Sequence, residues 1–136
     1  MNTRILVPNL AALLGLVLLT CHGVAADGRQ KSRFAGTYSG KFTTTDNQEG
    51  VVTVTVDDKG NITGESTNTT LDQTAKLSGT VDDDGRGKIV FEFPTATYTA
   101  SGVSSKTAKG TIIGIMIQRS GMRAMGAIEF ELIPKS

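Results

Sequence analysis

The stretch Val-Thr-Val-Thr-Val-Asp-Asp-Lys-Gly-Asn-Ile-Thr-Gly-Glu-Ser, residues 52–66, decides the fold of this chain. Valine and threonine alternate over its first five positions, which is the period of a β-strand with one buried face. Asp57–Gly60 then offers an aspartate to open a type I turn and a glycine for the left-handed position that follows. Alternation resumes at Ile62. The stretch therefore predicts an antiparallel β-hairpin.

The same pattern extends over the whole chain beyond Arg33. The Asn/Asp-x-x-Gly turn signal returns at Asn47–Gly50 and Asp82–Gly85, while Ser120-Gly121 is expected to turn the last hairpin and Pro94 to end the fifth strand. No segment after residue 26 has a helical period. The expected strands cover residues 34–42, 52–56, 62–67, 75–81, 88–93, 96–100, 111–117 and 124–132.

Glycines inside these strands indicate how the sheet closes. They recur at Gly36, Gly40, Gly64, Gly79 and Gly126, and interior glycines permit the sharp coiling that a small barrel needs. Short hairpins throughout leave no long crossing connection. We therefore predict an all-β fold, an eight-stranded antiparallel up-and-down meander barrel, with a β-sandwich as the alternative.

The first 26 residues have the organisation of a signal peptide. Arg4 is the only charged residue before Asp27, and the apolar run Leu10–Thr20 is too short to span a bilayer comfortably. Small residues at Gly23–Ala26 suit cleavage. We expect a signal peptide at 1–26, a flexible arm at 27–33 and one β-barrel domain at 34–136.

A lipoprotein reading of the leader is the alternative. It would use Leu18–Cys21 as the lipidation box, with the lipid on Cys21, although Thr20 stands where a smaller residue is usual. Both interpretations place the product outside the cytoplasm, secreted or periplasmic, with no transmembrane segment after cleavage. The complete cleavage region downstream of Cys21 favours the ordinary signal peptide.

Loss of the leader also removes Cys21 and His22, the only cysteine and histidine of the 136-residue chain, which has no tryptophan. Most enzyme nucleophiles, general bases near neutral pH and tight transition-metal ligands are thereby missing. Without Arg4 the 14 basic residues become 13, against 13 acidic ones. The net charge is near zero, and no basic stripe with interleaved aromatics appears, which argues against a nucleic-acid partner.

The remaining carboxylates do not suggest an active site either. The acidic turns at 57–61 and 82–85 lack the ligand spacing of a calcium loop and are interpreted as turn chemistry. The strand glutamates fall on polar faces, where water keeps their acidity ordinary. They are Glu65, Glu92, Glu129 and Glu131. We expect no catalytic residue, no metal and no cofactor, and hence no enzyme.

Three segments resemble the avidin-like and lipocalin-like small secreted β-barrels. Phe34–Tyr38 (Phe-Ala-Gly-Thr-Tyr) is similar to the opening strand of avidins, Val54–Glu65 to their second hairpin and Ala75–Val81 to their fourth strand. The resemblance implies a calycin-type barrel. It does not extend to biotin binding, because avidins hold biotin between tryptophans and this chain has none.

Two sets of residues are candidates for binding. The first lies on predicted inward faces, where a buried tyrosine hydroxyl either ties the barrel shut or meets a ligand. Its members are Tyr38, Phe42, Ser66, Phe91, Phe93 and Tyr98. The second lies in Thr111–Ile128, where an apolar strand must expose one face either to a partner, such as a second copy, or to a covering segment. Its members are Ile113, Ile115, Ile117, Met122 and Met125.

These observations leave two classes of function open. One is an exported, non-catalytic barrel that binds a small apolar ligand or a protein partner. The other is a structural, envelope-associated module with a filled core and no ligand. The aliphatic and phenylalanine-rich interior favours a filled core, since small eight-stranded barrels either fill with side chains or hold one small molecule.

Overall fold

The computed structural model describes residues 30–136. The expected signal peptide, Cys21 and the first residues of the expected arm lie outside the described residues. Eight β-strands follow one another along the chain. They are β1 (Gly36–Thr44), β2 (Glu49–Val56), β3 (Asn61–Asn68), β4 (Gln73–Val81), β5 (Arg86–Glu92), β6 (Thr97–Lys106), β7 (Ile112–Ser120) and β8 (Arg123–Pro134).

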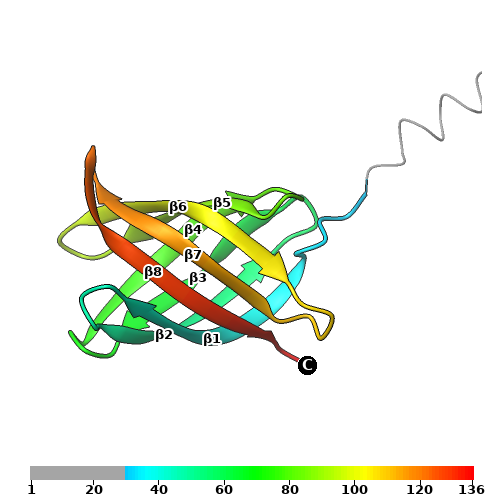
Figure 1. The fold of residues 1–136 in the computed structure, drawn as a ribbon, viewed down its shortest axis with the longest axis horizontal. Coiled ribbons are helices and arrows are strands. Elements are labelled where there is room, and N and C mark those ends of the chain that lie inside the picture. The colour runs from blue at the N-terminus through cyan, green and yellow to red at the C-terminus, as the bar shows by residue number, and fades with distance from the viewer. Residues whose placement is uncertain (1–29) are drawn as a thin grey trace, which may run out of the picture. The chain divides into compact units, whose positions relative to one another are not determined.

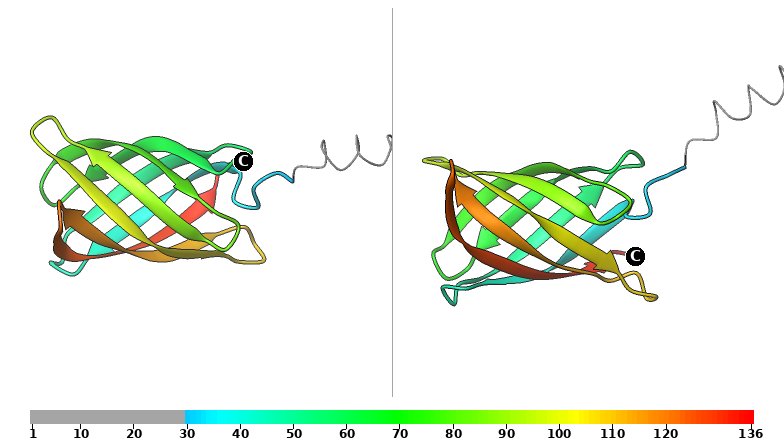
Figure 2. Two further views of the ribbon diagram at one scale, coloured as in Figure 1. Left: turned by 90° about the horizontal axis from the view of Figure 1, so that it is seen from above. Right: turned by 45° about the horizontal axis from the view of Figure 1, so that its top comes forward.

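The strands form one closed barrel in which every neighbour is antiparallel (Figures 1 and 2). Each strand pairs with the next along the chain, and β8 returns to pair with β1. This confirms the predicted all-β meander barrel and rules out the β-sandwich. The architecture is the one that avidin-like and lipocalin-like barrels share.

The period-two pattern determines which side chains face the barrel interior. Val54, Val56 and Ile62 are buried, whereas the neighbouring Thr53, Thr55 and Thr63 face solvent. A side chain of this size stabilises the fold by roughly 1.5–3 kcal/mol when fully buried. Outside the barrel, Thr37 and Thr55 lie across neighbouring strands with their hydroxyl oxygens 3.2 Å apart. Threonine therefore covers the outer surface while aliphatic residues fill the inside.

Four hairpin turns share one hydrogen-bonding pattern. The backbone N–H of the first residue donates to the carbonyl of the residue four positions later, and its carbonyl accepts the N–H of the residue three positions later. Its side-chain oxygen also accepts the backbone N–H of the residue four positions later. The residue in the third position after the first has a positive φ, which suits glycine or asparagine. The four turns occupy residues 44–48, 57–61, 82–86 and 107–111.

Two of the sequence-based turn assignments need correction. The first hairpin turns at residues 44–48 rather than 47–50, because Asn47 itself takes the left-handed position with φ 62°. Gly50 lies inside β2, where an added Cβ would strike the ring of Phe42. The sixth strand does not end at residue 100 but continues to Lys106, because Thr107 opens the next turn in place of an Asx residue.

The segment before β1 closes one end of the barrel. We call residues 31–35 the plug. The first strand was expected to begin at Phe34, but it begins at Gly36, and Phe34 instead turns its ring into the interior with 1% of its surface exposed. Tyr38 Oη donates to the Phe34 carbonyl at 2.7 Å and lies 3.3 Å from the Ala35 carbonyl. The tyrosine hydroxyl therefore ties the barrel shut.

Contacts with two neighbouring loops hold the plug in place. Ser32 donates its backbone N–H to the Asp58 carbonyl at 2.8 Å, and Lys31 forms an exposed ion pair with the same residue at 3.5 Å. From the end of β6, Lys106 Nζ donates to the Arg33 carbonyl at 2.9 Å. Exposed ion pairs contribute little, so Phe34 burial and the backbone bonds are the main restraints.

We predict that Tyr38→Phe lowers the free energy of unfolding by about 1 kcal/mol, since it leaves the Phe34 carbonyl without its tyrosine donor. Tyr98→Phe is the matched control, because within residues 30–136 the Tyr98 hydroxyl makes no hydrogen bond. Urea unfolding of both variants measures the difference. Equal stabilities of the two variants would contradict the assigned role of the Tyr38 hydroxyl.

The Asp57 turn should make stability depend on pH. The Asn61 backbone N–H, at 2.8 Å from Oδ1, and then the Asn61 side-chain amide lower the pKa of Asp57 below its usual 3.8. A lowered pKa in the folded state adds stability that is present above pH 3.8 and is lost as pH falls through the folded value. Asp57→Asn should therefore lower Tm at neutral pH, with a gap to wild type that closes in acid.

Thermal unfolding from about pH 6 to about pH 2 measures that gap. Asp83→Asn is the control, because the Asp83 carboxylate accepts no hydrogen bond from residues 30–136. A gap for Asp57→Asn that stays constant over the whole range would show that the carboxylate charge is not what the turn stabilises.

Candidate functional site

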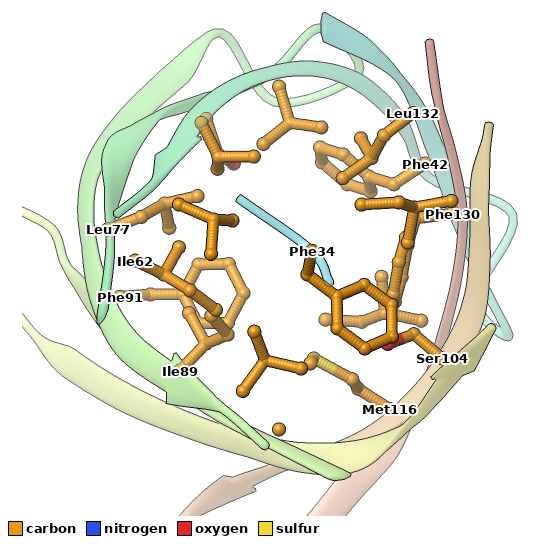
Figure 3. A pocket seen from close by; sticks show the side chains of 18 residues that line it. Phe34, Phe42, Ile62, Leu77, Ile89, Phe91, Ser104, Met116, Phe130 and Leu132 are labelled. Atoms are coloured by element: carbon orange, nitrogen blue, oxygen red, sulfur yellow. The ribbon is translucent and has the colours of Figure 1, made fainter. Parts of the chain in front are cut away.

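The barrel interior holds an apolar cavity of about 100 Å³, which we call the lumen. Its wall is built from the inward residues of all eight strands, and Figure 3 shows their side chains arranged in a ring around an open centre, with Phe34 reaching in from the plug. Only two wall residues have polar side chains, Ser66 and Ser104. The other labelled wall residues are Phe42, Ile62, Leu77, Ile89, Phe91, Met116, Phe130 and Leu132.

A second cavity of about 160 Å³ lies at the end of the barrel away from the plug. We call this cavity the mouth. It shares Phe42, Ser66, Phe91 and Ile128 with the lumen wall, so the two cavities adjoin. Its further lining is mostly polar and uncharged. The polar members are Thr44, Thr45, Gln48, Asn68, Gln73, Tyr98 and Gln118, together with the acid Asp46.

Inward side chains therefore change character along the barrel axis. On β3 the inward positions run from Ile62 near the plug through Ser66 to Asn68 at the mouth, and on β7 Met116 is followed by Gln118. Because alternate residues of a strand share one face, each amide continues the same face as the apolar residues before it. The interior is almost wholly apolar at its closed end and mixes polar with apolar side chains at its open end.

Hydrogen bonds orient part of the mouth. Asn68 Oδ1 accepts the backbone N–H of Leu71 at 3.0 Å, and Asn68 Nδ2 donates to Gln48 Oε1 at 2.9 Å. With its oxygen used in this way, Gln48 keeps the two N–H groups of its amide, which have no acceptor within the described residues. The mouth thus presents hydrogen-bond donors from an amide whose position is set by its neighbour.

Ser66 lies where the lumen meets the mouth. It is the buried polar residue of the core, 4% exposed, and it lines both cavities. Its hydroxyl makes no hydrogen bond to any group within residues 30–136, and no fully enclosed side-chain N or O atom there is left without a partner. The Ser66 hydroxyl must therefore face the open space of the channel. By contrast, Ser104 Oγ donates to the Gly85 carbonyl at 3.1 Å.

The structure brings together five of the six residues predicted to bind a ligand. Phe42, Ser66 and Phe91 line both cavities, while Phe93 and Tyr98 line the mouth alone, with their rings in an edge-to-face contact at 5.7 Å. Tyr38 is the exception. Its ring is buried near the plug and its hydroxyl is occupied by carbonyls, so it lines neither cavity.

The sequence analysis missed the polar residues of the mouth and the plugging role of Phe34. A signal for the mouth was present, because Thr44, Asn68, Gln73 and Gln118 continue the alternation of predicted strands by one step of two residues. For Phe34 no comparable signal exists. Its spacing from Tyr38 places it on the inward face, but nothing local shows that the chain leaves the strand there and turns over residues 32–35 to close the barrel end.

The apolar strand β7 exposes one face to solvent, as expected. Ile113, Ile115 and Ile117 point outward with 43%, 43% and 39% of their surfaces exposed, and Val103 lies beside Ile115 on β6. We call these four residues the outer row. Of the two methionines predicted to extend it, Met122 is 98% exposed at the hairpin tip, and Met125 lines the mouth.

The described part of the chain shows no cluster of metal-ligating side chains. Among residues 30–136 no three of Asp, Glu, His and Cys approach closely enough to hold a metal ion together. The carboxylates of Asp57 and Asp82 instead accept backbone N–H groups in their own turns. The same residues include no helix long and apolar enough to cross a membrane.

Comparisons with known proteins were negative. A scan against protein-family models found no match to this chain. Searches of curated proteins and of solved structures also found no similar protein.

Proposed function

We propose that this protein is an exported, non-catalytic barrel that binds a small, largely apolar ligand in its lumen. The observation that carries the proposal is a preformed apolar cavity, plugged at one end by Phe34 and adjoining an open mouth at the other. Binding sites for small molecules are typically concave, apolar and equipped with a few polar groups. The signal peptide predicted at 1–26 supports a location outside the cytoplasm.

The size of the lumen limits what it can hold. An apolar cavity of roughly 150 Å³ is enough to bind benzene. The lumen measures about 100 Å³ and the mouth about 160 Å³. A ligand thus places a hydrocarbon group no larger than a small ring or short chain in the lumen, and the rest of the molecule lies in the mouth. The lipocalin-like resemblance agrees with such use, at the level of architecture.

We predict that toluene, used as a probe, enters the lumen and shifts the methyl NMR signals of isoleucines that line it. The chain offers its own control, because it has lumen-facing and solvent-facing residues of one type. Saturable shifts are expected at Ile62, Ile89, Ile112 and Ile128, with none at Ile113, Ile115, Ile117 and Ile133.

Two results would count against ligand binding. If the lumen-facing methyl signals do not move up to saturating toluene, the interior is full, and the filled structural module becomes the better description. If all isoleucines shift alike, the probe adheres to the surface only. Native mass spectrometry of protein from its natural source then shows directly whether a ligand is carried.

The outer row favours self-association as a second property. Glu129 and Glu131 lie on β8 at one side of the row, and Arg86 and Lys88 lie on β5 at the other. In a dimer with a two-fold axis along β7, the acids of one copy approach the bases of its partner. Charge layout thus supports a second copy as the partner for the exposed isoleucines.

We predict a dimer in sedimentation equilibrium that dissociates in Ile115→Asp, because a buried, unpaired carboxylate opposes association. Thr53→Asp, on the outward face of β2, is the matched control and should leave the dimer intact. A wild-type protein that remains a monomer at every concentration would dismiss the outer row as an interface.

A further inference from the structure

The mouth lacks the charges that an ionic ligand needs. No lysine or arginine lines it, and Asp46, its one charged residue, is exposed on the hairpin turn at 44–48. A carboxylate or phosphate at this place would give up water without gaining a positive partner and would face Asp46. Desolvation of an unpaired charge is costly, so the lining selects against anions.

A positively charged ligand is also poorly served. Asp46 could attract a cation only through solvent, where an ion pair contributes little. An ammonium group in the mouth would also lose water and would need amide oxygens as acceptors in its place. Of those oxygens, Asn68 Oδ1 and Gln48 Oε1 already accept hydrogen bonds within the protein. The groups that remain available favour a neutral acceptor and donor.

We propose that the ligand is an uncharged amphipathic molecule whose polar head carries a carbonyl, amide or hydroxyl group. This inference rests on the proposed function and names the ligand class of the same site. The apolar body points past Ser66 toward Phe34, and the head stays at the level of Ser66 and Gln48. Ser66 Oγ, 4% exposed and without a partner in residues 30–136, supplies one hydrogen bond to the head.

The amides provide the rest of the recognition. Gln48 offers N–H donors, and Gln73 on β4 and Gln118 on β7 each offer a donor and an acceptor. Ser66 is the buried polar group of this site, and its hydroxyl would lose water and stay unpaired beneath a ligand without a polar head, which disfavours such a ligand. Purely apolar molecules therefore bind, but more weakly than a neutral amphiphile of equal size.

Three probes that share a six-carbon chain and differ in their polar heads test the preference for a neutral head at neutral pH. They are hexanamide, hexanoate and hexylammonium, with affinities measured by calorimetry on the purified protein. Hexanamide should bind at least about tenfold more tightly than either ion, because only the ions lose hydration without a partner. Equal or tighter binding of hexanoate or hexylammonium would overturn the inference.

Variants of the mouth test the assigned contacts. Ser66→Ala and Gln118→Leu should each lower the preference for hexanamide over toluene by about threefold to tenfold, because each removes a hydrogen bond that only the amide head makes. Ser101→Ala, on the outward face of β6, is the control and should not change that preference. An unchanged preference in both mouth variants, with folding verified by circular dichroism, would show that the head is not held there.

The experiments separate this inference from the proposed function. If toluene enters the lumen but the three heads bind alike, the lumen binds apolar molecules and the neutral-head assignment is wrong. If neither toluene nor any hexyl probe binds, the proposed function itself fails.

Discussion

The antiparallel pairing of β8 with β1 is the interaction on which the rest of the structure depends. Without it the meander would be a curved sheet with two unpaired edges, and its apolar face would have nothing to pack against. With it, every strand has two neighbours and the apolar face encloses itself. The plug, the lumen and the mouth all exist because the sheet closes on itself.

Closure also gives the barrel two different ends. The plug covers one end, where Phe34 is buried and the Tyr38 hydroxyl bonds to its carbonyl. The other end has no such cover within the described residues and is lined by amides and hydroxyls. The lumen is therefore open at one end only. This asymmetry gives the proposed ligand an orientation, with its hydrocarbon part in the lumen and its polar head at the mouth.

Prediction succeeded where one short-range pattern was sufficient. Alternation placed Val54, Ile62 and Leu77 on the inner face correctly, and aspartate with glycine three positions later located the turns that begin at Asp57 and Asp82. It failed where two signals competed. Asn47 suits both the first position and the left-handed position of a turn, so local rules do not choose between the two registers. Gly50 therefore resembles a turn residue in the sequence, although it lies in β2 against the ring of Phe42.

By itself, the sequence determined the fold class, the number of strands and the face on which most side chains lie, because these follow from periods and turns of a few residues. Only the tertiary structure decided that Phe34 plugs one end, that Tyr38 serves the plug rather than the cavity, and that amides from several strands meet at the mouth. Those residues are far apart in the chain. Their meeting depends on barrel closure and strand stagger, which no local pattern encodes.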